Sequence, residues 1–159
     1  MATYVFAWNP KLWNWPELPR KARTIRQRGH VDIEWSSGRN KNIEPGSRAF
    51  FVRLGVPPKG LIGSGYTLTA PEPVIHWRPE KAAKGLMTND LRLRLEFLTD
   101  LPIISFDELA TPPWSRFRWG VRQSGVRLPS SLADLLEPWW EERVQASARA
   151  QAARKPRRV

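Results

Sequence analysis

The chain of 159 residues contains no cysteine. This absence excludes disulfide bonds, thiolate metal sites and cysteine nucleophiles, and it is common in cytoplasmic proteins. Histidine is scarce as well: neither His30 nor His76 has the spacing to carboxylates that metal motifs require. The sequence therefore predicts no metal or other cofactor, and it favours a cytoplasmic location.

Long apolar runs and catalytic motifs are also missing. No run approaches the roughly 20 apolar residues of a membrane span, and the N-terminus lacks the pattern of a secretion signal. The sequence has no Gly-x-Ser-x-Gly elbow and no phosphate-binding glycine loop. Asp32 and Glu34 share a face of an expected strand, which indicates a solvent-facing pair more than an acid–base site. We therefore expect a protein without enzyme activity and without membrane contact.

Positive charge is abundant and unevenly distributed. The chain has 26 Lys/Arg and 15 Asp/Glu, a net charge of +11. Residues 1–59 hold 11 basic and 4 acidic residues, and residues 143–159 hold six basic residues and no acid. This distribution favours a polyanionic partner, although a solvated surface can carry the same charge.

Tryptophan is unusually frequent, with nine residues against two tyrosines. Tryptophan concentrates in cores, interfaces and stacking sites. Because a small core does not easily hide nine indoles, some of them are expected on a binding surface.

Hydrophobic patterning predicts an α+β fold. Short strands are expected at 3–8, 30–35, 48–54, 61–69 and 91–97, and helices at 19–28 and from 131 onwards. Strict βαβ alternation is absent, which argues against a doubly wound parallel sheet. We expect a small mixed β-barrel of five to six strands with two peripheral helices, and an irregular proline-rich segment at 71–84. Residues 1–146 would form this domain, and 147–159 a basic, disordered tail or linker.

The stretch around Trp35 is the first candidate site. An expected strand ends on Trp35, and Ser36, Ser37, Arg39 and Lys41 follow closely. A flat ring beside small polar groups and cations suits a site that stacks a base, reads its edge and holds the phosphate backbone. A core tryptophan followed by an ordinary polar turn is the competing interpretation.

A second patch combines arginines and aromatic residues. Arg116, Arg118, Trp119 and Arg122 follow one another closely, and Ser124 comes shortly after them. Such side chains are candidates for contacts with a nucleic-acid backbone or groove.

These features together resemble the EVE domain, a branch of the PUA-like superfamily. The resemblance covers about residues 3–140. It is carried by a strand that ends in Trp8, a basic helix, Trp35-Ser36-Ser37-Gly38-Arg39, Ile43-x-Pro45-Gly46-x-Arg48, Gly60-x-Ile62-Gly63-x-Gly65 and Trp119…Ser124-Gly125-x-x-Leu128. The acidic residue usual in the family's Gly-Asp turn is Ser47 here. The related YTH domains resemble the chain at Trp35-Ser36 and at Ile75-His76-Trp77.

The resemblance implies a pseudo-barrel with a pocket for one modified base. EVE-type modules of this kind occur at the N-terminus of HNH nucleases in modification-dependent restriction systems, where 5-methylcytosine or 5-hydroxymethylcytosine is flipped out of duplex DNA. It implies bacterial, nucleoid-associated activity with a fused or associated nuclease. The expected pocket residues are Trp35, Trp77, Ser36, Ser37, Trp8 and Asn9. The expected contacts to the DNA backbone or groove are Arg39, Lys41, Arg116, Arg118, Trp119, Arg122 and Ser124.

Two other functions fit the same sequence. The chain can be an RNA-binding PUA-like module that reads a modified nucleotide, or a protein-interaction module that uses exposed tryptophans.

Overall fold

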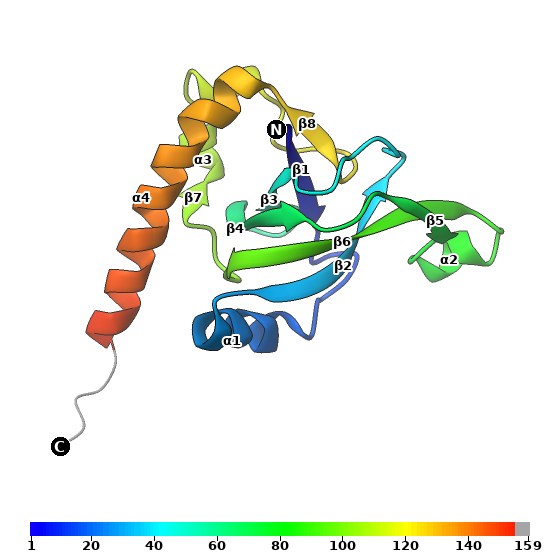
Figure 1. The fold of residues 1–159 in the computed structure, drawn as a ribbon, viewed down its shortest axis with the longest axis horizontal. Helices are drawn as coiled ribbons and strands as arrows, with labels where there is room; N and C mark the ends of the chain where they lie inside the picture. The colour runs from blue at the N-terminus through cyan, green and yellow to red at the C-terminus, as the bar shows by residue number, and fades with distance from the viewer. Residues whose placement is uncertain (155–159) are drawn as a thin grey trace.

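A computed structural model describes residues 1–154 and shows one mixed sheet with flanking helices (Figure 1). The strands are β1 (Thr3–Trp8), β2 (Val31–Gly38), β3 (Arg48–Arg53), β4 (Gly60–Thr67), β5 (Glu72–Ile75), β6 (Met87–Leu98), β7 (Ile104–Ser105) and β8 (Val126–Leu128). The helices are α1 (Leu18–Arg28), α2 (Pro79–Ala82), α3 (Phe106–Leu109), the 3-10 turn η1 (Trp114–Arg116) and α4 (Ser130–Arg154). The predicted α+β class is confirmed.

The eight-stranded sheet is open, which corrects the predicted barrel of five to six strands. Its strand order is β2-β6-β4-β3-β1-β8, with β5 paired to β6 and β7 paired to β4. Within residues 1–154 no backbone ladder joins β2 to β1 or β8. Side chains bridge this seam instead: Trp35 Nε1 donates to the Ala7 carbonyl at 3.2 Å, and Asn40 Nδ2 donates to the Gly125 carbonyl at 2.7 Å. An indole ring therefore lies where a ladder would close the barrel.

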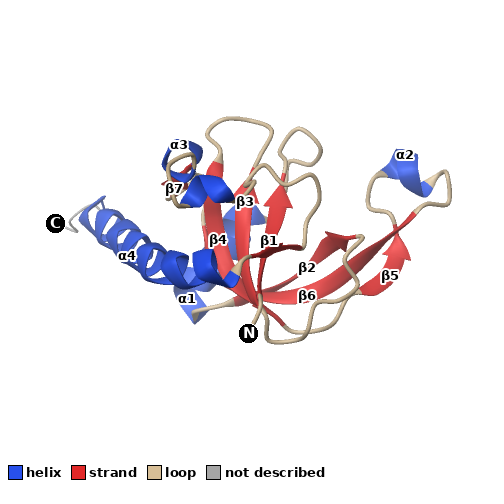
Figure 2. Ribbon diagram, turned by 90° about the horizontal axis from the view of Figure 1, so that it is seen from above, coloured by secondary structure: helices blue, strands red, loops and turns tan. Residues whose placement is uncertain are grey.

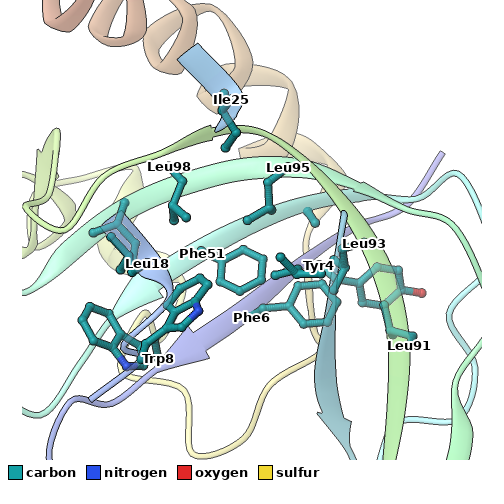
Figure 3. Close-up of a cluster of buried hydrophobic side chains, with 14 of the residues drawn as sticks. Tyr4, Phe6, Trp8, Leu18, Ile25, Phe51, Leu91, Leu93, Leu95 and Leu98 are labelled. Atoms are coloured by element: carbon teal, nitrogen blue, oxygen red, sulfur yellow. The ribbon is translucent and has the colours of Figure 1, made fainter. Parts of the chain in front are cut away.

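The first hydrophobic core lies between the curved sheet and α1. Figure 3 shows side chains of β1, β3 and β6 meeting Leu18 and Ile25 of α1. This helix ends as predicted at Gly29, whose φ of 88° is left-handed and whose N–H donates to the Ile25 carbonyl at 2.7 Å. The amphipathic pattern of the sequence thus fixes α1 against the sheet.

The second core lies between the other face of the sheet and α3, η1 and α4. Side chains along β1 alternate between the two faces of the sheet, so Phe6 lies in the first core and Val5 in the second. Leu132, Leu136 and Trp140 pack there from α4. One continuous α4 contains Pro138 and extends to Arg154, so residues 147–154 of the expected tail are helical. Residues 155–159 of that range lie outside the described residues.

A two-stranded arm replaces the irregular segment predicted at 71–84. β5 pairs with the first residues of β6, and α2 lies at the tip, away from the rest of the sheet (Figure 2). β5 was not predicted from the sequence because it contains Pro73. Proline argues against a strand and is tolerated mainly in the edge strands of a sheet. β6 consequently begins at Met87, before the expected 91–97.

None of the helices within residues 1–154 has the length and apolarity needed to cross a bilayer.

Candidate functional site

A groove of about 950 Å³ opens at the unpaired seam of the sheet and runs to the arm. The ends of β1 and β2, the start of β6, the segment 121–124 and the arm all contribute to its walls. Its volume falls within the range of typical ligand sites.

The groove brings together eight of the residues predicted from the sequence. They come from four separate parts of the chain: Trp8, Asn9, Trp35, Ser36, Arg39, Trp77, Arg122 and Ser124. The two tryptophans marked as pocket walls, Trp35 and Trp77, therefore line the same groove.

Five other predicted residues lie outside it. Ser37 is 0% exposed and donates to the Asn40 carbonyl at 2.8 Å, so it does not face a ligand as expected. Trp119 is buried in the second core, where its Nε1 donates to the Trp114 carbonyl at 2.9 Å. The remaining three are cations that are exposed away from the groove: Lys41, Arg116 and Arg118. The residue types at these five positions suit a nucleic-acid site, but residue type alone does not indicate which way a side chain points.

A cluster of indoles forms one wall. Half-buried Trp35 has its ring centroid 4.6 Å from Trp15 and 5.6 Å from Trp13. Trp8 Nε1 donates to the Trp13 carbonyl at 2.8 Å, which fixes the loop that carries Trp13. Trp13 stays 42% exposed, whereas Trp15, which looks exposed in the sequence, is only 3% exposed.

The backbone of Trp15 is strained. Its φ of 41° is in the left-handed region, which is uncommon for a bulky residue. Strain of this kind persists where surrounding contacts hold it, and it is frequent at functional sites. Here it places the Trp15 ring against Trp35 and Phe51.

The arm forms the opposite wall. Trp77 is 47% exposed and its ring stacks on His76 with 5.7 Å between centroids. His76 Nδ1 accepts the Arg78 backbone N–H at 3.1 Å, so the neutral ring carries its proton on Nε2. Burial lowers the pKa of His76, and the nearby cations Lys81 and Arg78 lower it further. A neutral imidazole donor therefore lies beside an exposed indole.

The part of the groove between these walls is polar. Ser36 and Thr88 share a hydrogen bond of 2.9 Å, and a register shift between Ser36 and Gly38 ends the regular ladder. Asp90 lies opposite Ser36 on β6, and burial raises the pKa of its carboxyl group, with the charge of Glu34 adding to the effect. These groups can bind the polar edge of a ring.

The groove carries more positive than negative charge. Its acidic side chains are Glu34 and Asp90, and its basic side chains are Arg39, Arg78, Lys81 and Arg122. Among residues 1–154 no group of three or more His, Asp or Glu side chains could hold a metal ion. The groove therefore combines aromatic surface, polar groups and cations.

Thr88, Asp90 and Gln123 line the groove but were missed in the sequence. The strand pattern of the sequence could have indicated two of them, Thr88 and Asp90. The alternation of Leu91 and Leu93, continued backward, puts Thr88 and Asp90 on the face opposite those leucines.

No family model matches this chain, and no curated protein sequence matches it. Solved structures do resemble it. A protein from Pseudomonas syringae aligns with a TM-score of 0.56 at 13% identity, over 85% of this chain and 97% of its own. A hypothetical protein from Leishmania major aligns with a TM-score of 0.55 at 10% identity, over 89% and 96%. At these identities the likeness shows the fold alone.

Proposed function

We propose that this chain is a non-catalytic reader of modified cytosine in double-stranded DNA. A flipped-out 5-methylcytosine or 5-hydroxymethylcytosine would enter the groove between Trp35 and Trp77. One observation carries the proposal: Trp35 and Ser36 line a single groove with Trp77, which lies far from them in the sequence, and with Arg39 and Arg122.

The groove must supply enough binding free energy to offset the cost of flipping a base. Flipping a base costs a few kcal/mol of lost stacking and pairing. Aromatic walls return about 1–3 kcal/mol for one stacked base. Burial of an extra methyl group adds only about 0.8 kcal/mol. Preference for methylated over plain cytosine should therefore be modest, about fourfold, unless the groove encloses the methyl group closely.

The cations at the groove account for the sequence-independent part of the affinity. Arg39 and Arg122 are exposed beside the seam, where they can meet the phosphates that flank a flipped nucleotide. Each neutralised phosphate makes binding more sensitive to salt.

The resemblance to EVE-type modules extends the proposal to a biological setting. In that setting the chain serves a modification-dependent restriction system and delivers a fused or associated HNH nuclease to modified DNA. Cleavage would belong to that nuclease.

Binding to matched duplexes tests the proposal. The duplexes carry plain cytosine, 5-methylcytosine, 5-hydroxymethylcytosine or N6-methyladenine at one position, and each is titrated at two salt concentrations. We expect the tightest binding to one of the modified cytosines, with the same salt dependence for all probes because the modification adds no charge. Equal affinity for every duplex would refute the reader function, and tighter binding to a modified single-stranded RNA would favour the RNA-binding alternative.

A second candidate function is protein interaction, favoured by the apolar surface of the arm. Four large apolar side chains are exposed there: Ile75, Trp77, Leu86 and Met87. Exposed apolar patches commonly mark interaction sites. This function predicts no affinity for nucleic acid even at low salt, so the same titrations separate the two candidates.

A further inference from the structure

Asp90 differs from the other half-buried carboxylates because its side chain has no partner within residues 1–154. Asp32 pairs with Arg94 at 2.8 Å, Glu137 pairs with Arg48 at 2.8 Å, and Glu108 pairs with Arg143. In residues 1–154 the Asp90 side chain takes part in no such ion pair or hydrogen bond, although it lines the groove. Burial raises its pKa, the charge of Glu34 adds to this effect, and the nearby His76 opposes it.

The position of Asp90 is firmly fixed. It lies on β6 between two strands, opposite Ser36 of β2 and Glu72 of β5. Cross-strand neighbours have their Cβ atoms about 4.5–5.5 Å apart. The carboxylate is therefore held next to the residue that follows Trp35, at the edge of the proposed stacking surface.

A carboxylate at this point discriminates between ring edges. It accepts hydrogen bonds from an amino group, such as N4 of cytosine or N6 of adenine, and it repels a carbonyl oxygen, such as O4 of thymine. His76 adds a donor, because its Nδ1 already accepts the Arg78 N–H and its Nε2 proton has no acceptor among the described residues, so it can donate to a ring acceptor. An acceptor beside a donor complements the amino group and ring nitrogen of cytosine.

We propose that Asp90 selects bases whose ring edge carries an amino group, so that the groove distinguishes 5-methylcytosine from thymine, which bears the same methyl group. This inference rests on the proposed function and assigns it a specificity-determining residue.

The stability of an Asp90 variant separates recognition from a structural role. A raised pKa means that the folded state favours the protonated carboxyl, so ionisation at neutral pH destabilises the fold relative to the unfolded chain. Replacing Asp90 with asparagine removes this effect. The Asp90→Asn variant should therefore keep or raise Tm, whereas loss of a structural carboxylate would lower it.

The test compares wild type and Asp90→Asn on two duplexes that differ only in one base: 5-methylcytosine opposite guanine, and thymine opposite guanine. Both bases carry the methyl group. The thymine mismatch flips more easily, but this difference cancels when the ratio of affinities is compared between the two proteins. Glu96→Gln is the matched control, because Glu96 is an exposed carboxylate of the same strand and lies outside the groove.

We expect Asp90→Asn to lower the preference for 5-methylcytosine over thymine by about tenfold or more, since an amide can donate to a carbonyl as well as accept from an amine. Glu96→Gln should leave the ratio unchanged. If Asp90→Asn leaves the ratio of affinities for 5-methylcytosine and thymine unchanged and still prefers methylated to plain cytosine, Asp90 does not select the base. The proposed function would stand in that case. If wild type shows no preference for methylated cytosine, the proposed function itself fails.

Discussion

The tryptophans divide between two regions that use the same side chain differently. On the groove side are Trp8, Trp13, Trp15, Trp35 and Trp77, and on the helix side are Trp114, Trp119, Trp139 and Trp140. Three of the groove-side rings are partly or largely exposed, and they line an open space. On the helix side, Trp119 and Trp140 are buried in the second core, and the partly buried Trp114 and Trp139 pack against it.

The bonds of the indole nitrogens show the same division. Trp140 is buried and its Nε1 donates to Ser64 Oγ at 2.8 Å, which joins α4 to β4. Trp35 Nε1 donates across the open seam to β1, so its bond holds one wall of the groove. The comparison indicates that helix-side tryptophans stabilise the fold and groove-side tryptophans form a surface for a planar ligand.

The largest expected effect is loss of stability on the helix side. Trp140→Ala should lower the free energy of unfolding by about 3–5 kcal/mol, because it leaves a large cavity and an unsatisfied Ser64 hydroxyl. Chemical denaturation measures the change. Trp140→Phe keeps most of the volume and should cost clearly less. A loss below about 1 kcal/mol for the alanine variant would show that α4 does not depend on this ring.

On the groove side, Trp77→Ala should change binding and leave stability nearly intact. Trp77 is largely exposed, so its removal should alter the free energy of unfolding by only about 0.5 kcal/mol. Loss of one stacking wall should weaken binding of a methylated duplex by about 1–3 kcal/mol. Titration and denaturation of the same preparation check both values, and a variant with full affinity would remove Trp77 from the site.

Trp35→Ala should abolish the preference for the modified base and leave some non-specific binding. The cations remain in this variant, and they bind plain and modified DNA equally. Because Trp35 is half-buried, Trp35→Phe serves as the variant that preserves packing and part of the stacking surface. Equal losses on plain and modified duplexes, with the fold intact, would contradict the assignment of Trp35.

A smaller effect is expected from the cations of the groove. Arg39→Gln should weaken binding to all duplexes by a similar factor and reduce the slope of log K against log salt by about 1. Lys41→Gln is the control, since Lys41 is exposed outside the groove. If Arg39→Gln changes only the preference for the modified base, Arg39 contacts the base and not the phosphate.

The smallest effect is expected for Asp32. This carboxylate belongs to the same β2–β6 ladder as Asp90 but, unlike Asp90, forms an ion pair. The hydrogen bond from Arg94 holds the pKa of Asp32 below its ordinary value. Its stabilisation is therefore present above the unfolded pKa near 4 and is lost as the pH falls through the lower folded value. Asp32→Asn should cost less than about 1 kcal/mol at pH 7 and almost nothing near pH 2, as pH-dependent denaturation can measure. A loss that is equal at both pH values would exclude the ion pair as its cause.

Local signals in the sequence predicted most of the elements. Apolar runs and turn residues located β1, α1 and β3, and Gly46, which follows Pro45 before β3, has a positive φ of 84° that glycine adopts readily. The arm was missed because Pro73 interrupts its strand pattern. The open seam was missed because sheet closure depends on long-range pairing, which the local pattern around Trp35 does not contain.

The site was predicted only in part, because local motifs can be recognised in a sequence and contacts between distant residues cannot. Trp35 and Trp77 stand in short motifs with a recognisable composition, so they could be predicted as pocket residues from the sequence. Ser36 and Ser37 were both assigned to the pocket as small polar residues that follow Trp35, yet consecutive strand residues point to opposite sides. Asp90 stands in no motif, and its significance comes only from its having no ion-pair or hydrogen-bond partner among the residues that the structure describes.

Fluorine NMR of the protein labelled with 5-fluorotryptophan tests the central division most directly. The nine signals, assigned by single Trp→Phe variants, are followed while a duplex with one 5-methylcytosine is added. The account predicts that the signals of Trp13, Trp35 and Trp77 shift strongly and those of Trp119 and Trp140 stay in place. Strong shifts on the helix side with an unperturbed groove would contradict it.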